Sequence, residues 1–268
     1  MTSVRLPLFP LNSVLFPGLV LPLNVFEARY RALMRDLLDL PEDERRFGVV
    51  AIRDGREVAH TGTGMPDTTV AQAVGPAAGF GPEPIRAFHQ VGCVADAATI
   101  RVKDAESVAE ADALPGEEEL PGAGDDGAPG YEVLATGTTR FRLHSVDASG
   151  PYLVGEVTEL AEEDGDEAGA LAAGVERAFR AYQQRLAWAN ERTLSSGQEL
   201  PDEPAVLSYL VAAATVLDVP AKQRLLQAPD TATRLADELK TLRRETALIG
   251  KLPSLPATEL TRRPTHPN

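Results

Sequence analysis

The chain is poor in cysteine and in positive charge. Cys93 is the single cysteine among 268 residues, which excludes an internal disulfide and a cysteine-based zinc site and fits a reducing compartment. Lys and Arg number 26 against 40 Asp and Glu, so the formal net charge is −14. Because a surface of this charge repels phosphate backbones, we expect no DNA partner. With 43% hydrophobic residues, the composition predicts one large or two small packed domains of a soluble, cytoplasmic, acidic protein.

An unbroken hydrophobic run of the kind that spans a membrane is also missing near the N-terminus. The stretch Leu6–Phe26 carries no charge, but four prolines interrupt it: Pro7, Pro10, Pro17 and Pro22. Each proline costs about 3 kcal/mol inside a helix, and no small-residue cleavage motif follows the stretch. We therefore predict no membrane contact and no signal peptide here. The stretch is typical of two short strands, Val4–Leu8 and Leu19–Leu23, joined by a loop.

Two acidic segments account for the whole net charge. Asp104–Gly130 holds nine acids and no base, and Glu162–Glu167 holds five acids and no base. The first segment is also rich in Gly, Pro and Ala, so it cannot bury enough apolar surface to offset its ordering entropy. We predict flexible loops at 61–87 and 104–130. The acidic loop is interpreted as a solvated insertion, with a docking tail for a basic partner as the alternative.

The N-terminal part, residues 1–160, reads as a β domain with one early helix. Apolar residues recur at helical spacing over Glu27–Leu40. Further short strands are expected at Phe47–Ile52, Phe88–Ala95, Thr99–Val102, Tyr131–Ala135, Arg140–Val146 and Tyr152–Val157. In the fifth of these, alternation places Phe141, Leu143 and Ser145 on one side, and Arg140, Arg142 and His144 on the other. The pattern predicts a small, mostly antiparallel barrel or sandwich.

The C-terminal part, residues 165–250, reads as an α-helical bundle. Helical periodicity begins at Ala168, breaks at Thr193–Pro201 and resumes over Glu203–Leu217. A short helix is expected to begin at Pro220, and a last helix to span Thr231–Ile249 with Gly250 as its C′ residue. The proline-containing tail 251–268 is predicted to be disordered. The fold class is therefore α+β, with the strands first and the helices after them.

Motifs that carry catalysis are absent from the sequence. There is no P-loop, no Gly-x-Ser-x-Gly elbow and no His-Glu-x-x-His, and the four histidines lack metal-binding spacing: His60, His89, His144 and His266. Gly122–Gly127 matches a dinucleotide fingerprint as a string, but no helix is expected after it. Cys93 lies in an apolar strand and is interpreted as a packed residue. We predict no catalytic residue, no cofactor-binding residue and no metal site, and hence no enzyme.

Several blocks of the sequence occur in the order of a known family. They are the opening Leu6–Leu33 (LPLFPLNSVLFPGLVLPLNVFEARYRAL), Gly48–Val50, His89–Ala95, Gly137–Arg142, Pro151–Val157, and Lys222–Asp230 followed by Arg234-Leu235. Together they resemble the Lon protease N-terminal (substrate-binding) domain family over about residues 4–250. The resemblance implies a PUA-like β-barrel followed by a helical bundle, a fold that Lon, cereblon and standalone bacterial proteins share.

The resemblance also implies a function. In Lon this region is associated with recognition of substrate polypeptides and with assembly, and an ATPase and a Ser–Lys peptidase follow it. Because this sequence contains neither, we expect a standalone, non-catalytic domain that binds exposed or unfolded polypeptide segments. Such a domain would serve as a protein quality-control adaptor, with a protease or chaperone as a further partner.

The residues expected to bind polypeptide are mostly apolar and aromatic. They are Phe9, Leu11, Leu15 and Phe16 in the first loop, Phe26, Arg29 and Tyr30 at the start of the first helix, and Trp188 in the helical part. Each group has a structural alternative. The loop residues would instead plug one end of the barrel, the second group would pack the first helix on the barrel, and Trp188 would pack in the core.

Three other functions stay open at this point. An enzyme would need a perturbed carboxylate or histidine in a cleft between the domains. An RNA-binding module would use Arg101, Arg140 and Arg142 despite the acidic surface. Weak self-association through the last helix is the third, because its four-three spacing suits either a bundle or a dimer.

Overall fold

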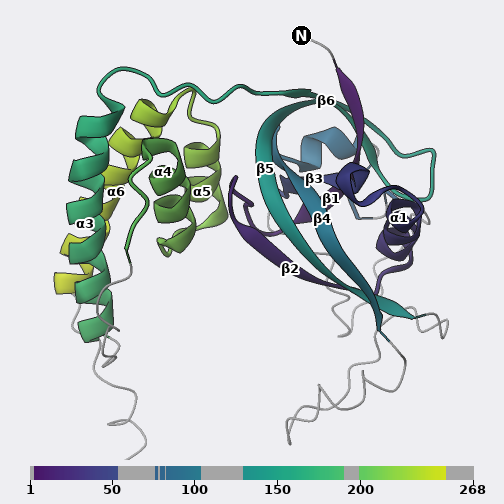
Figure 1. Ribbon diagram of the computed structural model, residues 1–268, viewed down its shortest axis with the longest axis horizontal. Coiled ribbons are helices and arrows are strands. Elements are labelled where there is room, and N and C mark those ends of the chain that lie inside the picture. Colours follow the sequence, from purple (N-terminus) through teal and green to yellow (C-terminus); the bar gives the residue numbers. More distant parts are fainter. Residues whose placement is uncertain are drawn as a thin grey trace, which may run out of the picture. The chain divides into compact units, whose positions relative to one another are not determined.

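The computed structural model describes residues 3–53, 76–77, 79–81, 83–103, 129–189 and 199–251. The chain divides into two compact units (Figure 1): unit 1 comprises residues 1–161 and 216–227, and unit 2 comprises residues 162–215 and 228–268. A mixed sheet with one early helix is followed by helices that pack together, which confirms the α+β class. Most of the predicted loops 61–87 and 104–130, and the tail beyond Lys251, lie outside the described residues.

The residues of unit 1 that the structure describes form six strands. They are β1 (Val4–Leu11), β2 (Val20–Val25), β3 (Arg46–Ala51), β4 (Val91–Lys103), β5 (Gly130–Asp147) and β6 (Val154–Glu159). Their order is β2-β5-β4-β3-β1-β6, and β5 also pairs with β6, so the sheet closes on itself through β5. The β1–β3 pair is parallel and the other pairs are antiparallel.

The two longest strands differ from the sequence prediction. The sequence predicted two short strands in place of β4 and two in place of β5. Instead, β4 is one continuous strand of 13 residues and β5 one of 18 residues. The strands stay continuous because the pairing of β4 with β5 contains bulges, where the register shifts after Cys93 and after Asp96. A further shift after Leu143 turns Ser145 to solvent, so the predicted placement of Ser145 beside Phe141 and Leu143 is wrong.

Phe141 of β5 is fully buried in the core of the closed sheet. Two glycines on neighbouring strands make room for its ring. A Cβ at Gly92 would lie 2.4 Å from the Phe141 ring, and one at Gly48 would lie 2.9 Å from it. A larger residue at either position would force the ring out of the core.

The early helix forms where the periodicity predicts it. Helix α1 spans Ala28–Leu38 and is flanked by the short 3-10 turn η1 (Glu42–Glu44). Its buried side chains include four of the expected apolar residues: Tyr30, Leu33, Met34 and Leu37. A second 3-10 turn, η2 (Pro84–Ala87), precedes β4.

A helix from the C-terminal half of the sequence belongs to unit 1. Helix α5 (Val219–Leu226) begins at Asp218, whose carboxylate accepts a hydrogen bond of 2.8 Å from Ala221 N. Gln223 Nε2 donates to Val91 O at 2.7 Å, and Arg140 Nη1 donates to Leu226 O at 3.1 Å. Arg140, whose side chain bonds to the end of α5, is buried and is not part of the outer polar row that alternation predicted.

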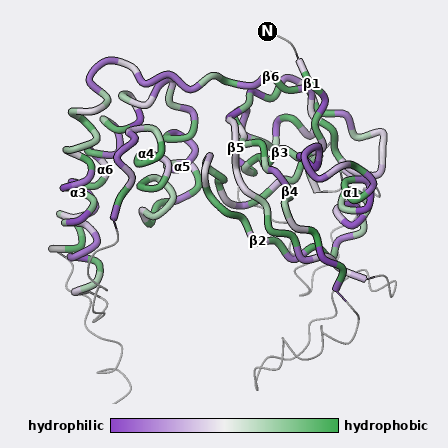
Figure 2. Tube along the Cα trace, viewed as in Figure 1, coloured by the Kyte–Doolittle hydropathy of each residue, from purple (hydrophilic) through white to green (hydrophobic). Residues whose placement is uncertain are grey.

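The described residues of unit 2 form three helices: α3 (Ala168–Ala189), α4 (Pro204–Ala214) and α6 (Thr231–Lys251). Hydrophobic and hydrophilic residues alternate along α3 and α6 (Figure 2), and their buried side chains form one core that includes Val175, Phe179, Leu235 and Leu242. Helix α6 continues past Gly250, so the predicted C′ role of that glycine is wrong. No helix in the described ranges has the length and apolar character needed to span a membrane.

Candidate functional site

The second acidic segment has a structural role in unit 2. The backbone carbonyls of Glu163 and Asp164 accept hydrogen bonds of 2.9 Å from the first N–H groups of α6, those of Thr231 and Ala232. The Asp230 carboxylate accepts a bond of 2.7 Å from Thr233 N. These groups satisfy amides that have no partner within the helix, and acidic side chains are favoured beside a helix N-terminus.

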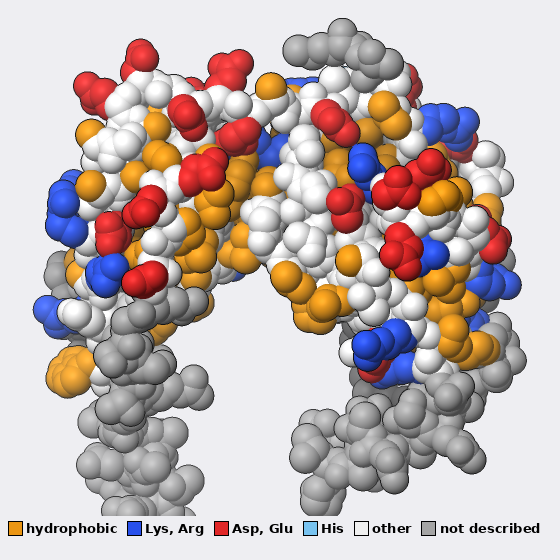
Figure 3. Space-filling model, viewed as in Figure 1, with side chains coloured by type: hydrophobic (Ala, Val, Ile, Leu, Met, Phe, Trp, Pro, Cys, Tyr) orange, Lys and Arg blue, Asp and Glu red, His pale blue; other side chains and the backbone are white. Residues whose placement is uncertain are grey.

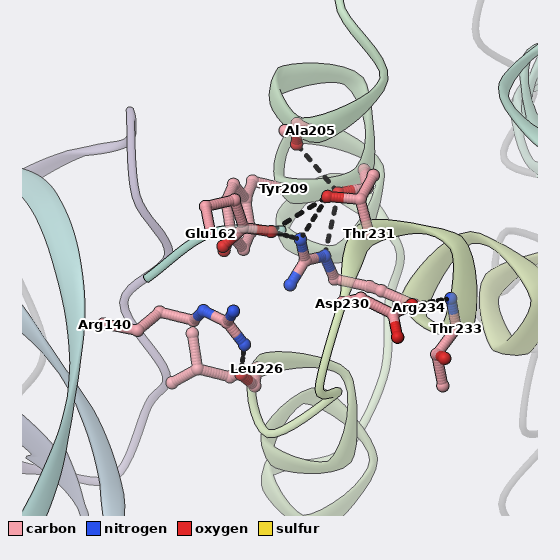
Figure 4. Close-up of polar contacts among 10 residues, drawn as sticks. Arg140, Glu162, Ala205, Tyr209, Leu226, Asp230, Thr231, Thr233 and Arg234 are labelled. Carbon is pink, nitrogen blue, oxygen red and sulfur yellow. Dashed lines mark hydrogen bonds and ion pairs between the residues drawn. The ribbon is translucent and has the colours of Figure 1, made fainter. Parts of the chain in front are cut away.

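Glu162 joins this segment to a buried polar network (Figure 4). The Arg234 side chain is fully buried, and its Nη2 donates to the Glu162 carboxylate. Its Nε donates to Ser208 Oγ at 2.8 Å, and its guanidinium lies 3.9 Å from the centre of the Tyr209 ring. The Tyr209 hydroxyl and Thr231 Oγ1 also donate to the Glu162 carboxylate. The network holds α4, α6 and the acidic segment together. No local residue spacing in the sequence predicts it.

Burial is the largest cause of most of the pKa shifts among the described groups, and the exception is the exposed Asp147, whose pKa is lowered by hydrogen bonds from Ser149. Burial raises the pKa of Glu238 well above its usual range, but its side chain is only 1% exposed, so a substrate cannot reach it. Burial raises the pKa of the Cys93 thiol to about 12, which leaves it a poor nucleophile. Burial and the Arg53 charge lower the pKa of His89. Among the described residues, no group of three or more His, Cys, Asp and Glu could hold a metal ion.

Most of the loop residues expected to bind polypeptide are part of the core. Phe9, Leu15 and Phe16 are buried, and Leu11 is partly buried. Phe9 stacks on Tyr30 with ring centres 4.2 Å apart, and burial raises the pKa of that tyrosine. In this conformation these side chains present little surface to a partner, and their binding role stays a prediction.

Arg29 joins the start of α1 to the chain around Phe80. Its Nη2 lies 2.7 Å from the Glu27 carboxylate, and its Nη1 donates to Pro76 O at 3.3 Å. Its guanidinium lies 4.7 Å from the Tyr30 ring centre and 5.2 Å from that of Phe80. These contacts position the helix start, and Phe26, just before it, is 72% exposed.

An exposed apolar face lies on β2 and its neighbour β5. Val20 is 56% exposed and Leu134 is 47% exposed, and Pro22 lies directly opposite Leu134 in the register. Hydrophobic side chains gather on this part of unit 1 (Figure 3). We call Val20, Pro22 and Leu134 the β2 surface. No local pattern in the sequence predicts this surface, because only the strand pairing brings Leu134 beside β2.

The β2 surface borders an open strand edge. In the part of the chain that is described, β2 pairs with β5 alone. Gly137 N donates to Leu19 O at 2.8 Å, so by antiparallel alternation residues 21, 23 and 25 pair with β5. The peptide groups of Val20, Pro22 and Asn24 therefore point away from β5, where another extended chain could pair with them.

The last predicted residue, Trp188, lies in unit 2. It is 71% exposed, so it does not pack in the core. With Ala181, Gln184 and Arg185 of α3 and Thr246 of α6 it lines a shallow groove, which we call the α3–α6 groove.

These features define an α+β protein with a closed mixed sheet and exposed apolar surfaces. The chain belongs to the family of the ATP-dependent protease La (Lon) substrate-binding domain, whose model matches residues 5–244. The resemblance drawn from the sequence is thereby confirmed. The family implies binding of polypeptide substrates in general, and it represents the substrate-binding part of that protease.

Two solved structures match most of the chain. The N-terminal domain of Mycobacterium avium complex Lon protease has a TM-score of 0.50 and 18% identity, covering 91% of this chain and 98% of that one. A Lon N-terminal domain protein from Xanthomonas campestris has a TM-score of 0.45 and 24% identity, covering 87% and 95%. No curated protein matches the sequence.

Proposed function

We propose that the protein binds exposed or unfolded polypeptide segments at the β2 surface and acts as a non-catalytic adaptor in protein quality control. The observation that carries this proposal is the open edge of β2 beside an exposed apolar face. An extended segment would pair its backbone with the peptide groups of Val20 and Asn24. Alternate side chains of that segment would then contact Leu134 and Pro22.

The chemistry of this edge favours transient rather than stable complexes. Pro22 has no N–H, so it interrupts the row of donors along the edge and limits how long a strand can be added. Only a few exposed apolar side chains contribute, and part of their gain offsets the entropy lost on association. We therefore expect micromolar to millimolar affinity, about −8 to −4 kcal/mol, which suits sampling of many clients.

Fluorescence anisotropy with a labelled, permanently unfolded model protein tests the proposal on the full chain. Leu134→Glu places a charge at the centre of the β2 surface and is expected to weaken binding about tenfold. Val4→Glu is the matched control, because Val4 is also an exposed strand residue of unit 1, at 51%. Circular dichroism checks that both variants fold. Equal binding of the unfolded model protein and of a labelled, stably folded protein, or equal loss in the two variants, would contradict the proposal.

A further inference from the structure

The C-terminal halves of α3 and α6 lie side by side at one end of unit 2. The two helices run parallel, since Gly165 adjoins Ala232, Gly174 faces Leu239, and the groove residues of α3 up to Trp188 meet Thr246. Side chains at matching levels of the two helices are therefore presented together.

This end of unit 2 is basic in an otherwise acidic chain. From residue 177 to the end of α3 there are three arginines and no acid. From residue 239 to 249 α6 has three basic residues and one acid, Glu245. Lys and Arg side chains are visible over these helices in Figure 3. Because the chain as a whole carries a net charge of −14, a local excess of positive charge needs an explanation.

Ion pairing divides these six bases into two sets. Three are paired within their own helix: Arg180 with Glu176 at 2.8 Å, Lys240 with Asp237 at 3.1 Å, and Arg244 with Glu245 at 2.9 Å. For the other three, Arg177, Arg185 and Arg243, none of the described acidic groups forms an ion pair. All three are exposed, so their charge is available to a partner.

The three arginines for which no described acid forms an ion pair lie on the groove side. Arg185 lines the α3–α6 groove itself. Arg177 comes four residues before Ala181, and Arg243 comes three residues before Thr246, so each shares a helix face with a groove residue. The helix macrodipole attracts bases only within the last turn, and Arg177 and Arg243 lie more than a turn from the ends of their helices. Helix capping therefore does not account for them.

We infer that the α3–α6 groove docks an acidic polypeptide segment, with an apolar side chain of that segment on the Trp188 indole and its carboxylates paired with Arg177, Arg185 and Arg243. Charge complementarity selects the acidic partner, and bidentate arginine–carboxylate pairing suits a peptide side chain. The groove is shallow, so it fits an extended segment. An exposed tryptophan flanked by arginines has the composition of an interaction hot spot. This surface lies in unit 2 and does not depend on the β2 surface.

Trp188 is the only tryptophan in the chain, so its fluorescence reports on this groove directly. The full chain is titrated with a 12-residue peptide of Glu, Asp and Leu, and with a counterpart in which Lys replaces the acids. We expect the acidic peptide alone to change the indole emission, with affinity that falls as salt rises toward 0.5 M. The double variant Arg185→Gln/Arg243→Gln is expected to weaken binding about tenfold.

The matched control is Lys240→Gln/Arg244→Gln, which removes the same charge from α6 at two internally paired positions that share no helix face with Thr246. Its affinity should stay within twofold of the wild type, and Leu134→Glu should leave the titration unchanged. Equal weakening in the two double variants, or no change in emission at millimolar peptide, would overturn the inference. Tighter binding of a single-stranded oligonucleotide of the same charge would overturn it as well and would identify a nucleic-acid site.

Discussion

Removal of the buried Arg234 guanidinium should unfold unit 2 at a much lower denaturant concentration. Its side chain is fully buried, whereas the side chain of its ionic partner Glu162 is 30% exposed. Arg234→Ala removes a charge-assisted hydrogen bond to Glu162, a bond of 2.8 Å to Ser208, and the contact with Tyr209. A hydrogen bond to a charged group contributes about 1.5–3 kcal/mol, and a desolvated cation–π contact about 2 kcal/mol.

These contributions do not add in full, because Glu162 regains water once its partner is gone. We expect a loss of about 3 kcal/mol, at the lower end of the range of about 3–5 kcal/mol measured when one partner of a buried pair is removed. With a urea dependence of about 1–3 kcal/mol per molar, the midpoint should fall by roughly 1–3 M.

Circular dichroism at 222 nm measures this change, because among the described residues α3, α4 and α6 of unit 2 comprise 22, 11 and 21 residues, against 11 and 8 for α1 and α5 of unit 1. Arg180→Ala is the control, since Arg180 is exposed and paired only with Glu176, and its loss should cost at most about 0.5 kcal/mol. A midpoint for Arg234→Ala equal to that of the control would show that the network does not stabilise unit 2.

Three further outcomes follow from the same structure. Gly137→Ala places a Cβ 2.4 Å from the Phe16 carbonyl oxygen and should lower the free energy of unfolding by about 1–3 kcal/mol, which a lower thermal midpoint would show. Gly169→Ala, which meets nothing within 4 Å, should raise the thermal midpoint slightly. Burial in the folded state raises the pKa of Glu238 above its ordinary 4.5, so folding takes up a proton and the free energy of unfolding falls as the pH rises above 4.5. In urea unfolding, Glu238→Gln should therefore stabilise the protein more at pH 7.5 than at pH 4.5. With its pKa near 12, Cys93 should release no chromophore from a thiol reagent at pH 8 when folded and one equivalent when unfolded; reaction in the folded state at the unfolded rate would contradict its burial.

Local periodicity was enough to place the early helix. Its apolar residues recur every three to four positions, and those residues, Leu33 and Met34 among them, are buried against the sheet. Helical spacing predicts which face is buried before any partner is known, because the helix makes its hydrogen bonds within itself. The same reasoning predicted α3 from Ala168 and α6 from Thr231.

Strand length and side-chain burial on the sheet were not predictable in this way. Arg140 and Arg142 share one side of β5 by alternation, yet Arg140 is buried and Arg142 is exposed. The difference depends on α5, which lies some eighty residues further along the chain and covers only one of them. The two expected breaks in β4 and β5 were in fact bulges, whose pairing depends on the partner strands.

The candidate sites show the same difference between what the sequence predicts and what tertiary contacts decide. The sequence alone determined the family, the α+β class, and the exposed aromatic residues Phe26 and Trp188 as candidates, because composition, periodicity and motif order are properties of the chain itself. Only the tertiary structure decided that Phe16 is buried, that Leu134 lies beside Pro22, and that α3 runs parallel to α6. Those facts depend on contacts between residues far apart in sequence, and such contacts leave no local pattern.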